Sequence, residues 1–250
     1  MLPHTSFSLV RTPLANAARR VTVKRVEDLT PTYRRIHLAG DFTTFDSAGA
    51  DDHLRIFFVP ADAVVEGPEQ MREFPSREYT PVAWTSDSLT LDFVIHGSGP
   101  ASSWAATAEV GTGAMIGGPR GSLVIEGRPD WWLLAGDRTA LPAIRRFLTQ
   151  VAPGVPADVV LIAEDVAERQ ELDSAGDVGV TWVRSLEELV AALDQAPTRE
   201  GDGFAFIAAE QSVVKPGREI LRRRGIDLDR AVVKGYWRRG LTADDPKTPQ

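Results

Sequence analysis

Hydrophobic and polar residues alternate along short runs in the first half of the chain. The clearest run is 89–96, where Leu89, Leu91, Phe93 and Ile95 alternate with residues that are mostly polar. This period of two is typical of a strand with one buried face. Strands are predicted at residues 21–26, 33–38, 54–59, 76–82, 89–96 and 114–116. Short strands at this density predict a six-stranded antiparallel β-barrel. The charged segment 61–72 lacks the period and is expected to be a surface loop.

The pattern changes in the second half. Residues 131–135 form an unbroken apolar run, typical of a strand buried on both faces, and 139–151 repeat apolar residues at helical spacing. Further strands are predicted at 158–163, 178–183, 204–208 and 231–235, and helices at 185–195 and 213–224. Ser185 and Glu188 form the capping-box pattern at the start of one helix. Alternating strands and helices predict an α/β domain with a parallel sheet covered on both faces.

These patterns divide the chain into four segments. We expect a frayed tail over residues 1–20, a barrel domain over 21–126, an α/β domain over 127–240 and a C-terminal tail over 241–250. The glycine-rich segment 111–118 is not a dinucleotide fingerprint, because its glycines precede a strand and open no helix.

Composition narrows the chemistry. The 250 residues include no cysteine, which excludes disulfides, Cys-ligated zinc, iron–sulfur clusters and a thiol nucleophile. The four histidines are scattered and form no HxxxH or HExxH pair, so we expect no dedicated metal site. Redox chemistry in this chain would therefore need a bound organic cofactor or a metal carried by the substrate.

Charge and hydropathy argue against two classes of partner. The net charge of −7 opposes nucleic-acid binding, and no apolar run is long enough to span a membrane. Arg11 and Pro13 interrupt the N-terminal apolar stretch, so we expect a cytoplasmic protein. The segment 215–239 holds nine Lys or Arg against three acidic residues. This segment is either a solvated helix face or a surface that attracts a small polyanion.

Two segments could bind an anionic, aromatic ligand. Arg77, Tyr79 and Thr80 offer a cation, an aromatic ring and a hydroxyl, and Arg77 and Tyr79 should share one strand face. Segment 96–102 contains two glycines that leave backbone N–H groups accessible, as in a phosphate cradle. An ordinary strand followed by a glycine loop would also account for these residues.

A third candidate is the turn at 135–140, which joins a buried strand to a helix. The N–H groups at a helix N-terminus carry about half a positive charge and suit a phosphate or a carboxamide. The alternative is that Asp137 or Thr139 serves only as the helix cap.

Five motifs in unbroken order give the chain a resemblance to a known family. They are RxYT at 77–80, DFVxHGxGPASxWA at 92–105, GPRGS at 118–122, WWLLAGDRTALPAI at 131–144 and GYWRRG at 235–240. Together these motifs resemble those of the siderophore-interacting proteins, which are flavin-dependent ferric-siderophore reductases. The resemblance implies a ferredoxin-reductase-like fold, with FAD in the barrel and NADPH or NADH in the α/β domain. It also implies a ferric siderophore as substrate, a monomer, and ferredoxin as an alternative electron donor.

The resemblance also implies residue roles. Tyr79 would pack on the isoalloxazine ring, and Thr80 would bond near its N5 atom. The residues that match FAD-binding positions are Arg77, Tyr79, Thr80, His96, Gly97, Gly99, Pro100, Ala101, Ser102 and Trp237. The residues that would face the nicotinamide are Asp137, Arg138, Thr139 and Ala140. Tyr236, beside Trp237, would cover the flavin or the adenine unless it is ordinary core. The cations proposed for an anionic iron chelate are Arg55, Arg120, Arg238 and Arg239.

Two positions depart from the family pattern. Val82 stands where the family commonly has a basic residue, and Arg138 stands where it commonly has an acidic one. Glu164 and Asp165 would repel a 2′-phosphate that lay near them, so NADH and NADPH both stay open. Two other functions also stay open: a flavin reductase serving a protein acceptor, and a siderophore-binding protein without turnover.

Overall fold

The computed structural model describes residues 7–60, 63, 65, 67–97 and 99–240. The chain forms two compact units. The barrel unit comprises Arg11–Ser122, and the α/β unit comprises Leu123–Gly240 together with the N-terminal residues up to Val10. Each unit is described separately below.

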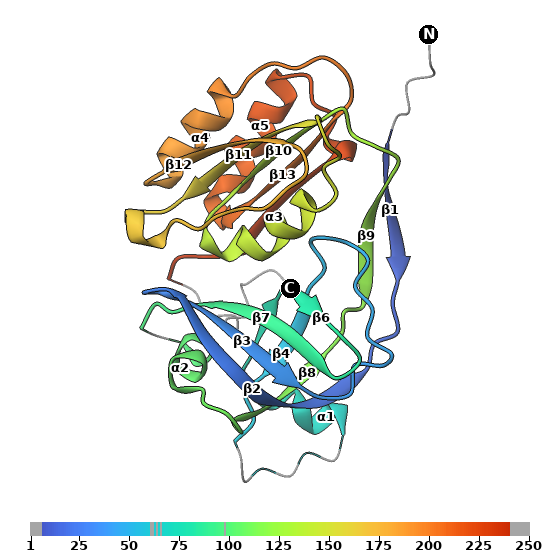
Figure 1. The fold of residues 1–250 in the computed structure, drawn as a ribbon, viewed down its shortest axis with the longest axis vertical. Coiled ribbons are helices and arrows are strands. Elements are labelled where there is room, and N and C mark those ends of the chain that lie inside the picture. Colours follow the sequence, from blue (N-terminus) through green and yellow to red (C-terminus); the bar gives the residue numbers. More distant parts are fainter. Residues whose placement is uncertain (1–6, 61–62, 64, 66, 98, 241–250) are drawn as a thin grey trace. The chain divides into compact units, whose positions relative to one another are not determined.

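The barrel unit is built on an antiparallel sheet (Figure 1). Its strands are β2 (Ala18–Thr30), β3 (Tyr33–Ala39), β4 (Leu54–Phe57), β5 (Ser76–Tyr79), β6 (Ala83–Trp84), β7 (Ser88–Val94) and β8 (Gly113–Gly117). Their order is β5-β4-β8-β2-β3-β7-β6. The predicted antiparallel barrel is confirmed, but with seven strands in place of six. The additional strand, β6, has two residues, too few to show a period in the sequence.

Alternating residues of these strands fill the core of the barrel unit. On β7, Leu89, Leu91 and Phe93 are fully buried, as the period of two predicts, and they join Ile36 and Leu38 of β3 in one cluster.

Two short helices of the barrel unit were not predicted. Helix α1 (Pro68–Met71) lies in the segment expected to be a loop, and it buries Met71 against Phe57 and Met115. Residues 61, 62, 64 and 66 of that segment lie outside the described residues. Helix α2 (Pro100–Thr107) occupies a stretch interpreted as part of a glycine loop. Its small residues show no apolar stripe, so the pattern gave no helical signal.

The α/β unit contains a five-stranded parallel sheet (Figure 1). Its strands are β10 (Trp131–Gly136), β11 (Pro156–Ile162), β12 (Asp177–Val183), β13 (Gly203–Glu210) and β14 (Ala231–Trp237). The helices are α3 (Leu141–Leu148), α4 (Leu186–Gln195) and α5 (Val214–Arg223). Four short 3-10 helices also occur: η1 (Arg138–Ala140), η2 (Val166–Glu168), η3 (Gln211–Val213) and η4 (Leu228–Arg230). The strand order is β12-β11-β10-β13-β14.

Helices cover both faces of this sheet, as predicted. Leu133 and Ile207 point toward the face packed by α4 and α5. On the other face, Trp132 and Phe204 pack around Phe147 of α3, with ring centroids 6.2 Å and 5.0 Å from it. The fully apolar run of β10 is therefore explained by burial on two sides.

The N-terminal segment corrects the expectation of a frayed tail. Strand β1 (Ser8–Pro13) pairs with β9 (Gly121–Glu126) in a two-stranded sheet, and β2 already begins at Ala18. Phe7 is 2% exposed and packs edge-on against Phe204, with centroids 6.2 Å apart. The partners of this segment lie more than 100 residues away, so no local pattern could reveal its order. Residues 1–6 and the predicted tail 241–250 lie outside the described residues.

Candidate functional site

In the barrel unit, β5 presents the predicted aromatic ring. Tyr79 lies opposite Leu54 of β4 and Arg77 lies opposite Ile56, so the two predicted residues share one face of the strand. The half-buried ring of Tyr79 packs against Phe93, with centroids 4.3 Å apart. Burial raises the pKa of Tyr79 well above its usual value, and the nearby Arg77 opposes the rise. The phenol therefore stays protonated and keeps a hydroxyl donor.

The predicted phosphate cradle is the start of α2. Gly97 and Gly99 have φ of 78° and 84°, a conformation that favours glycine, and a Cβ on Gly97 would meet nothing within 4 Å. Gly99 is the N-cap residue and supplies no side-chain cap, and Pro100 begins the helix. The backbone N–H of His96 donates to Ser102 Oγ at 2.9 Å, which folds the loop back onto the first turn. The first N–H groups of the helix thus receive no side-chain cap from Gly99.

Helix α2 is also anchored at its other end. Arg34 of β3 donates from Nη1 to the carbonyl oxygens of Ala105 and Ala106 at 3.0 and 2.9 Å, and from Nε to Asp28 at 2.6 Å. A cation at the C-terminus complements the helix dipole. Sequence reasoning missed this contact because Arg34 lies 71 residues from Ala105.

Two predicted substrate-binding cations lie elsewhere in the barrel unit. Arg55 lies directly opposite Glu78 and pairs with it at 2.8 Å, which places it on the other sheet face from Arg77 and Tyr79. Arg120 is exposed in the turn between β8 and β9.

In the α/β unit, the carboxyl end of β10 lies very close to β13. A Cβ on Gly136 would lie 2.3 Å from the carbonyl oxygen of Ala208 and 2.5 Å from Cβ of Ala140. Only glycine fits there without movement of the backbone. The close approach brings η1 to the edge of the sheet, directly after the strand.

Asp137 joins two of the predicted motifs. Its Oδ1 accepts the backbone N–H of Thr139 at 2.8 Å, and its Oδ2 accepts the indole N–H of Trp237 at 2.7 Å. Burial raises the pKa of Asp137, although the hydrogen bonds from Thr139 and Trp237 oppose the rise. The side chain of Asp137 is therefore a helix cap and also a tether to the end of β14.

Strand β14 orients its aromatic pair through an irregular register. Ala209 pairs with Gly235 and Glu210 with Trp237, so Tyr236 is the extra residue of a bulge. Tyr236 packs edge-on against Phe206, with centroids 6.4 Å apart, whereas Trp237 is 42% exposed. Tyr236 is thus partly buried against the core residue Phe206, and Trp237 offers a ring to solvent.

The remaining predicted residues of this unit are placed as follows. Arg138 forms an ion pair with Glu168 at 3.4 Å, and Glu168 is 7% exposed. Arg238 and Arg239 are exposed after β14, and the backbone N–H of Arg239 donates to Glu210 at 3.3 Å.

Comparison with known proteins identifies this arrangement. Residues 22–123 match the model of the siderophore-interacting FAD-binding domain, and residues 129–240 match that of the siderophore-interacting protein family. The chain is 33% identical over 235 residues to the NADPH-dependent ferric-chelate reductase of Escherichia coli, covering 88% of this chain and 92% of that protein. The chain belongs to the siderophore-interacting protein family. This membership confirms the resemblance that the sequence motifs indicated.

Other relatives of this siderophore-interacting protein support the same family and fold. The ferric vibriobactin reductase ViuB of Vibrio cholerae is 28% identical over 227 residues, covering 82% of this chain and 84% of ViuB. A siderophore utilization protein from T. fusca superposes with a TM-score of 0.83 at 29% identity, covering 95% and 98% of the two chains. A ferredoxin reductase of carbazole 1,9a-dioxygenase, at 14% identity and a TM-score of 0.66, shares the fold. This structural match covers 89% of the present chain and 68% of the ferredoxin reductase chain. The ferredoxin-reductase-like fold is thereby confirmed.

The barrel unit of this siderophore-interacting protein fits FAD. An aromatic plate at Tyr79, an uncapped helix start at α2 and two glycines of positive φ, of which Gly97 has open space at its Cβ position, match a flat ring joined to a pyrophosphate. Within the described part of the chain, no group of three His, Asp or Glu side chains is placed to hold a metal ion. No described helix is long and apolar enough to cross a membrane.

Proposed function

We propose that this siderophore-interacting protein is an FAD-dependent NAD(P)H:ferric-siderophore reductase. The observation that carries the proposal is its similarity, over almost its whole length, to a relative named as an NADPH-dependent ferric-chelate reductase. The placement of the motifs in each unit supports it independently. We place the activity in the cytoplasm and expect a monomer, with ferredoxin as an alternative donor.

We assign the barrel unit to FAD. Tyr79 would stack on the isoalloxazine, contributing about 0.5–1.5 kcal/mol beyond area burial, with Thr80 beside the ring. His96, Gly97, Gly99, Pro100, Ala101 and Ser102 would surround the pyrophosphate. The N–H groups available to it are those of Gly97, Gly99, Ala101 and Ser102, because Pro100 has none and the N–H of His96 donates to Ser102 Oγ. When bound, FAD accepts a hydride and gives up electrons singly, as a two-electron donor and a one-electron Fe(III) acceptor require.

We assign the carboxyl edge of the parallel sheet to the nicotinamide dinucleotide. Strand order reverses between β10 and β13, and ligands of open α/β sheets bind at such a switch point. Asp137, Arg138, Thr139 and Ala140 follow β10 at this point. Because Asp137 uses Oδ1 on Thr139 and Oδ2 on Trp237, its role is to fix the backbone N–H groups and the indole that face the ligand. We therefore assign no general acid or base.

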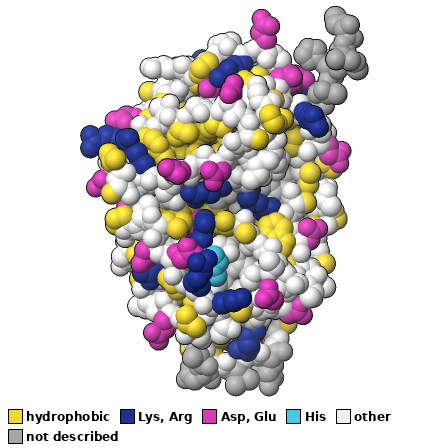
Figure 2. All heavy atoms as spheres, viewed as in Figure 1, with side chains coloured by type: hydrophobic (Ala, Val, Ile, Leu, Met, Phe, Trp, Pro, Cys, Tyr) yellow, Lys and Arg dark blue, Asp and Glu magenta, His cyan; other side chains and the backbone are white. Residues whose placement is uncertain are grey.

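The substrate would be bound by exposed cations. Catecholate iron chelates are multiply negative, and an arginine attracts one anionic oxygen at about 4 Å by roughly 1–4 kcal/mol near a surface. Arg120, Arg238 and Arg239 are exposed and suit this role, while Arg55 is already paired with Glu78. Basic and acidic side chains are interspersed on the face shown in Figure 2. We therefore expect individual arginines, and not a uniformly basic surface, to attract the iron chelate.

The decisive experiment is the visible spectrum of the purified protein after incubation with FAD. We expect flavin bands that bleach when NADPH or NADH is added without oxygen and return when a ferric siderophore is added, while a chelator traps Fe(II). Absence of flavin bands, together with tight binding of the ferric siderophore, would indicate a carrier. Bleaching that only a protein acceptor reverses would indicate a reductase of another protein.

A further inference from the structure

The carboxylate of Glu78 bridges two basic side chains of the barrel unit. Arg55 Nη2 donates to Oε1 of Glu78 at 2.8 Å, and His53 Nε2 lies 3.7 Å from Oε2. Arg55 also donates from Nη1 to Ser76 Oγ at 3.4 Å. The three bridged side chains lie on the face of β4 and β5 that points away from the barrel core. The positive charge of Arg55 is thus balanced by the carboxylate of Glu78.

This cluster is open to solvent. The side chains of Arg55, Glu78 and His53 are 39%, 45% and 52% exposed. Exposed ion pairs contribute little to folding stability, so the fold does not depend on the carboxylate of Glu78. The main effect of this carboxylate is on the electrostatic potential that an approaching ligand meets.

The cluster lies beside the turn that carries Arg120. Strand β4 lies between β5 and β8, and Arg55 pairs with Gly117 of β8. The chain continues from there into Gly118, where a Cβ would lie 3.8 Å from the carbonyl oxygen of His53. The turn between β8 and β9 is therefore packed along the start of β4.

Hydrogen bonds on both sides hold this turn in place. Asp52 is 3% exposed, and its Oδ2 accepts the hydroxyls of Ser122 at 2.5 Å and Ser47 at 3.0 Å. The carbonyl oxygen of Arg120 accepts the backbone N–H of Leu14 at 3.0 Å. The backbone of Arg120 is thus fixed next to the cluster, while its side chain is exposed.

The charge of a ferric chelate depends on the groups that hold the iron. Three hydroxamates neutralise Fe(III), whereas three catecholates leave a trianion. Arg55 and Arg120 each bring a positive charge to this surface, and Glu78 brings a negative one. Glu78 therefore cancels one of the two charges that would attract a trianion, and it scarcely changes the attraction of a neutral complex.

We propose that Glu78 is a specificity-determining residue, which neutralises Arg55 and so lets neutral ferric tris-hydroxamates compete with trianionic tris-catecholates as substrates. Discrimination between ligands commonly uses a repulsive group as well as attractive ones. The inference rests on the proposed function in one point, that a ferric chelate approaches the cations near Arg120. The sequence of β5 supports this placement, because Tyr79, the proposed flavin contact, directly follows Glu78 and consecutive Cα atoms lie about 3.8 Å apart.

The test measures binding apart from turnover. Gallium(III) complexes carry the same charges as the Fe(III) complexes and are not reduced by a flavin. Those of ferrichrome, a tris-hydroxamate, and enterobactin, a tris-catecholate, are titrated into the FAD-loaded protein at low ionic strength. We expect their dissociation constants to lie within about 10-fold of each other, and a preference for the trianion above about 100-fold would overturn the proposal.

Glu78→Gln keeps an oxygen for Arg55 and removes the negative charge. This substitution should tighten binding of the trianion about 5- to 20-fold at low salt and leave the neutral complex unchanged. Raising the salt concentration should reduce the gain, because the groups are exposed. An unchanged affinity for the trianion, or an equal change for both complexes, would overturn the proposal.

Two further variants show whether the gain is local. Glu109→Gln removes the same charge from an exposed residue that precedes β8, at the end of the strand away from Gly117, and should change neither affinity. Adding Arg55→Ala to Glu78→Gln should abolish the gain, because the gain comes from the guanidinium that Glu78 no longer neutralises. A gain that persists without Arg55 would overturn the proposed mechanism.

Turnover of the Fe(III) complexes distinguishes failure of this inference from failure of the proposed function. Reduction of both complexes in a ratio that Glu78→Gln does not change would refute the inference and leave the reductase intact. If neither complex is reduced but the gallium complexes bind as expected, the reductase proposal fails and the role of Glu78 stands. Absence of binding by either complex would overturn both.

Discussion

Helices α2 and α4 begin in opposite ways. At α4, Ser185 Oγ accepts the backbone N–H of Glu188 at 3.2 Å, and Glu188 reaches back to the N–H of Arg184 at 2.7 Å. At α2, Gly99 occupies the cap position and offers no side chain. An isolated helix start is stabilised by such caps, so their absence at α2 is a cost that a bound anion can offset. The comparison separates a helix start that side chains of the protein complete from one that has no side-chain cap.

The largest effect should come from closing the open start. Gly99→Ala adds a Cβ at φ 84° and ψ 154°, a region that residues other than glycine enter at a cost of about 1–3 kcal/mol. We expect the affinity for FAD to fall about 10- to 100-fold, measured by flavin fluorescence titration. Gly225→Ala, at φ 70° after α5, imposes strain far from the loop in sequence and should leave FAD affinity unchanged. Equal losses in both variants would contradict a local role.

A smaller effect should come from releasing the far end of α2. Arg34→Ala removes the donors to the carbonyl oxygens of Ala105 and Ala106, and it should lower the free energy of unfolding by about 2 kcal/mol. Because the loop at Gly99 begins the same helix, FAD affinity should also fall several-fold at temperatures where the variant stays folded. Arg25→Ala, which removes an exposed ion pair with Glu27, is the control. Unchanged FAD affinity in Arg34→Ala would show that the helix start holds its position alone.

Removing the cap of α4 should affect stability alone. Ser185→Ala is expected to lower the free energy of unfolding by about 1 kcal/mol, measured by urea denaturation. FAD affinity should not change, since this helix start is already completed by the chain. A loss of FAD affinity would remove the distinction drawn between α2 and α4.

The smallest effect concerns the capped turn at η1. Because burial raises the pKa of Asp137, the folded protein keeps this proton at pH values where the unfolded chain has lost it. Its stability contribution is present below about pH 4 and declines as pH rises through the folded pKa. Relative to the unaltered protein, Asp137→Asn should therefore become more stable as pH rises from about 4 to 7. Urea denaturation of both proteins across this range tests the trend, and a stability difference that does not change with pH would contradict it.

The sequence predicted most of the fold because its signals are local. The unbroken apolar run of β10 and the Ser185–Glu188 pair each identify an element from a few neighbouring residues. Strand β1 gave no such signal, because its stability comes from pairing with β9, which begins at Gly121. The Glu188 carboxylate also bonds one residue earlier than the capping-box pattern implies.

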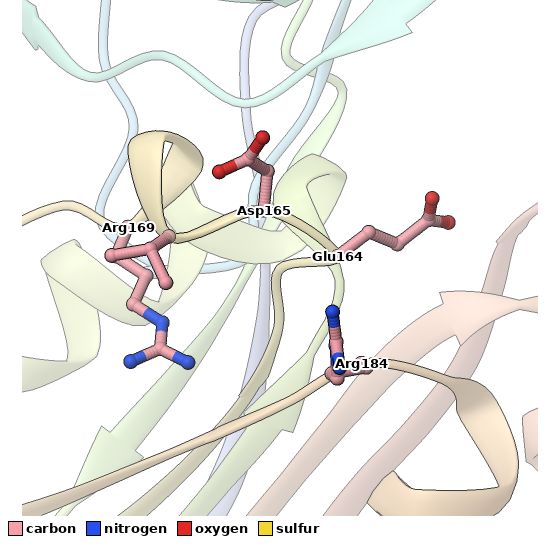
Figure 3. Close-up of a pocket in the computed structure, with 5 residues that line it drawn as sticks. Glu164, Asp165, Arg169 and Arg184 are labelled. Carbon is pink, nitrogen blue, oxygen red and sulfur yellow. The ribbon is translucent and has the colours of Figure 1, made fainter.

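The site was predictable only in part for the same reason. Motifs located the loop at Gly99 and the turn at Asp137, but the bond from Trp237 to Asp137 spans 100 residues and required the fold. Arg169 and Arg184 belong to no motif, and the pairing of β11 with β12 brings them to the lining of one pocket (Figure 3). The face on which Arg55 lies depends on the register of β4 against β5.

The burial of Phe7 bears on whether the two halves can be separated. Because Phe7 covers the edge of Phe204 and lies under the guanidinium of Arg230 at 5.5 Å, a polypeptide starting at Leu123 would leave an apolar patch uncovered. Such a fragment would tend to aggregate unless a peptide carrying the first dozen or so residues were supplied in trans. Isolating the α/β unit of this reductase therefore requires two pieces of chain, the N-terminal segment and the polypeptide from Leu123 onward. Protease cleavage after β1 would test whether the α/β unit keeps its N-terminal segment bound.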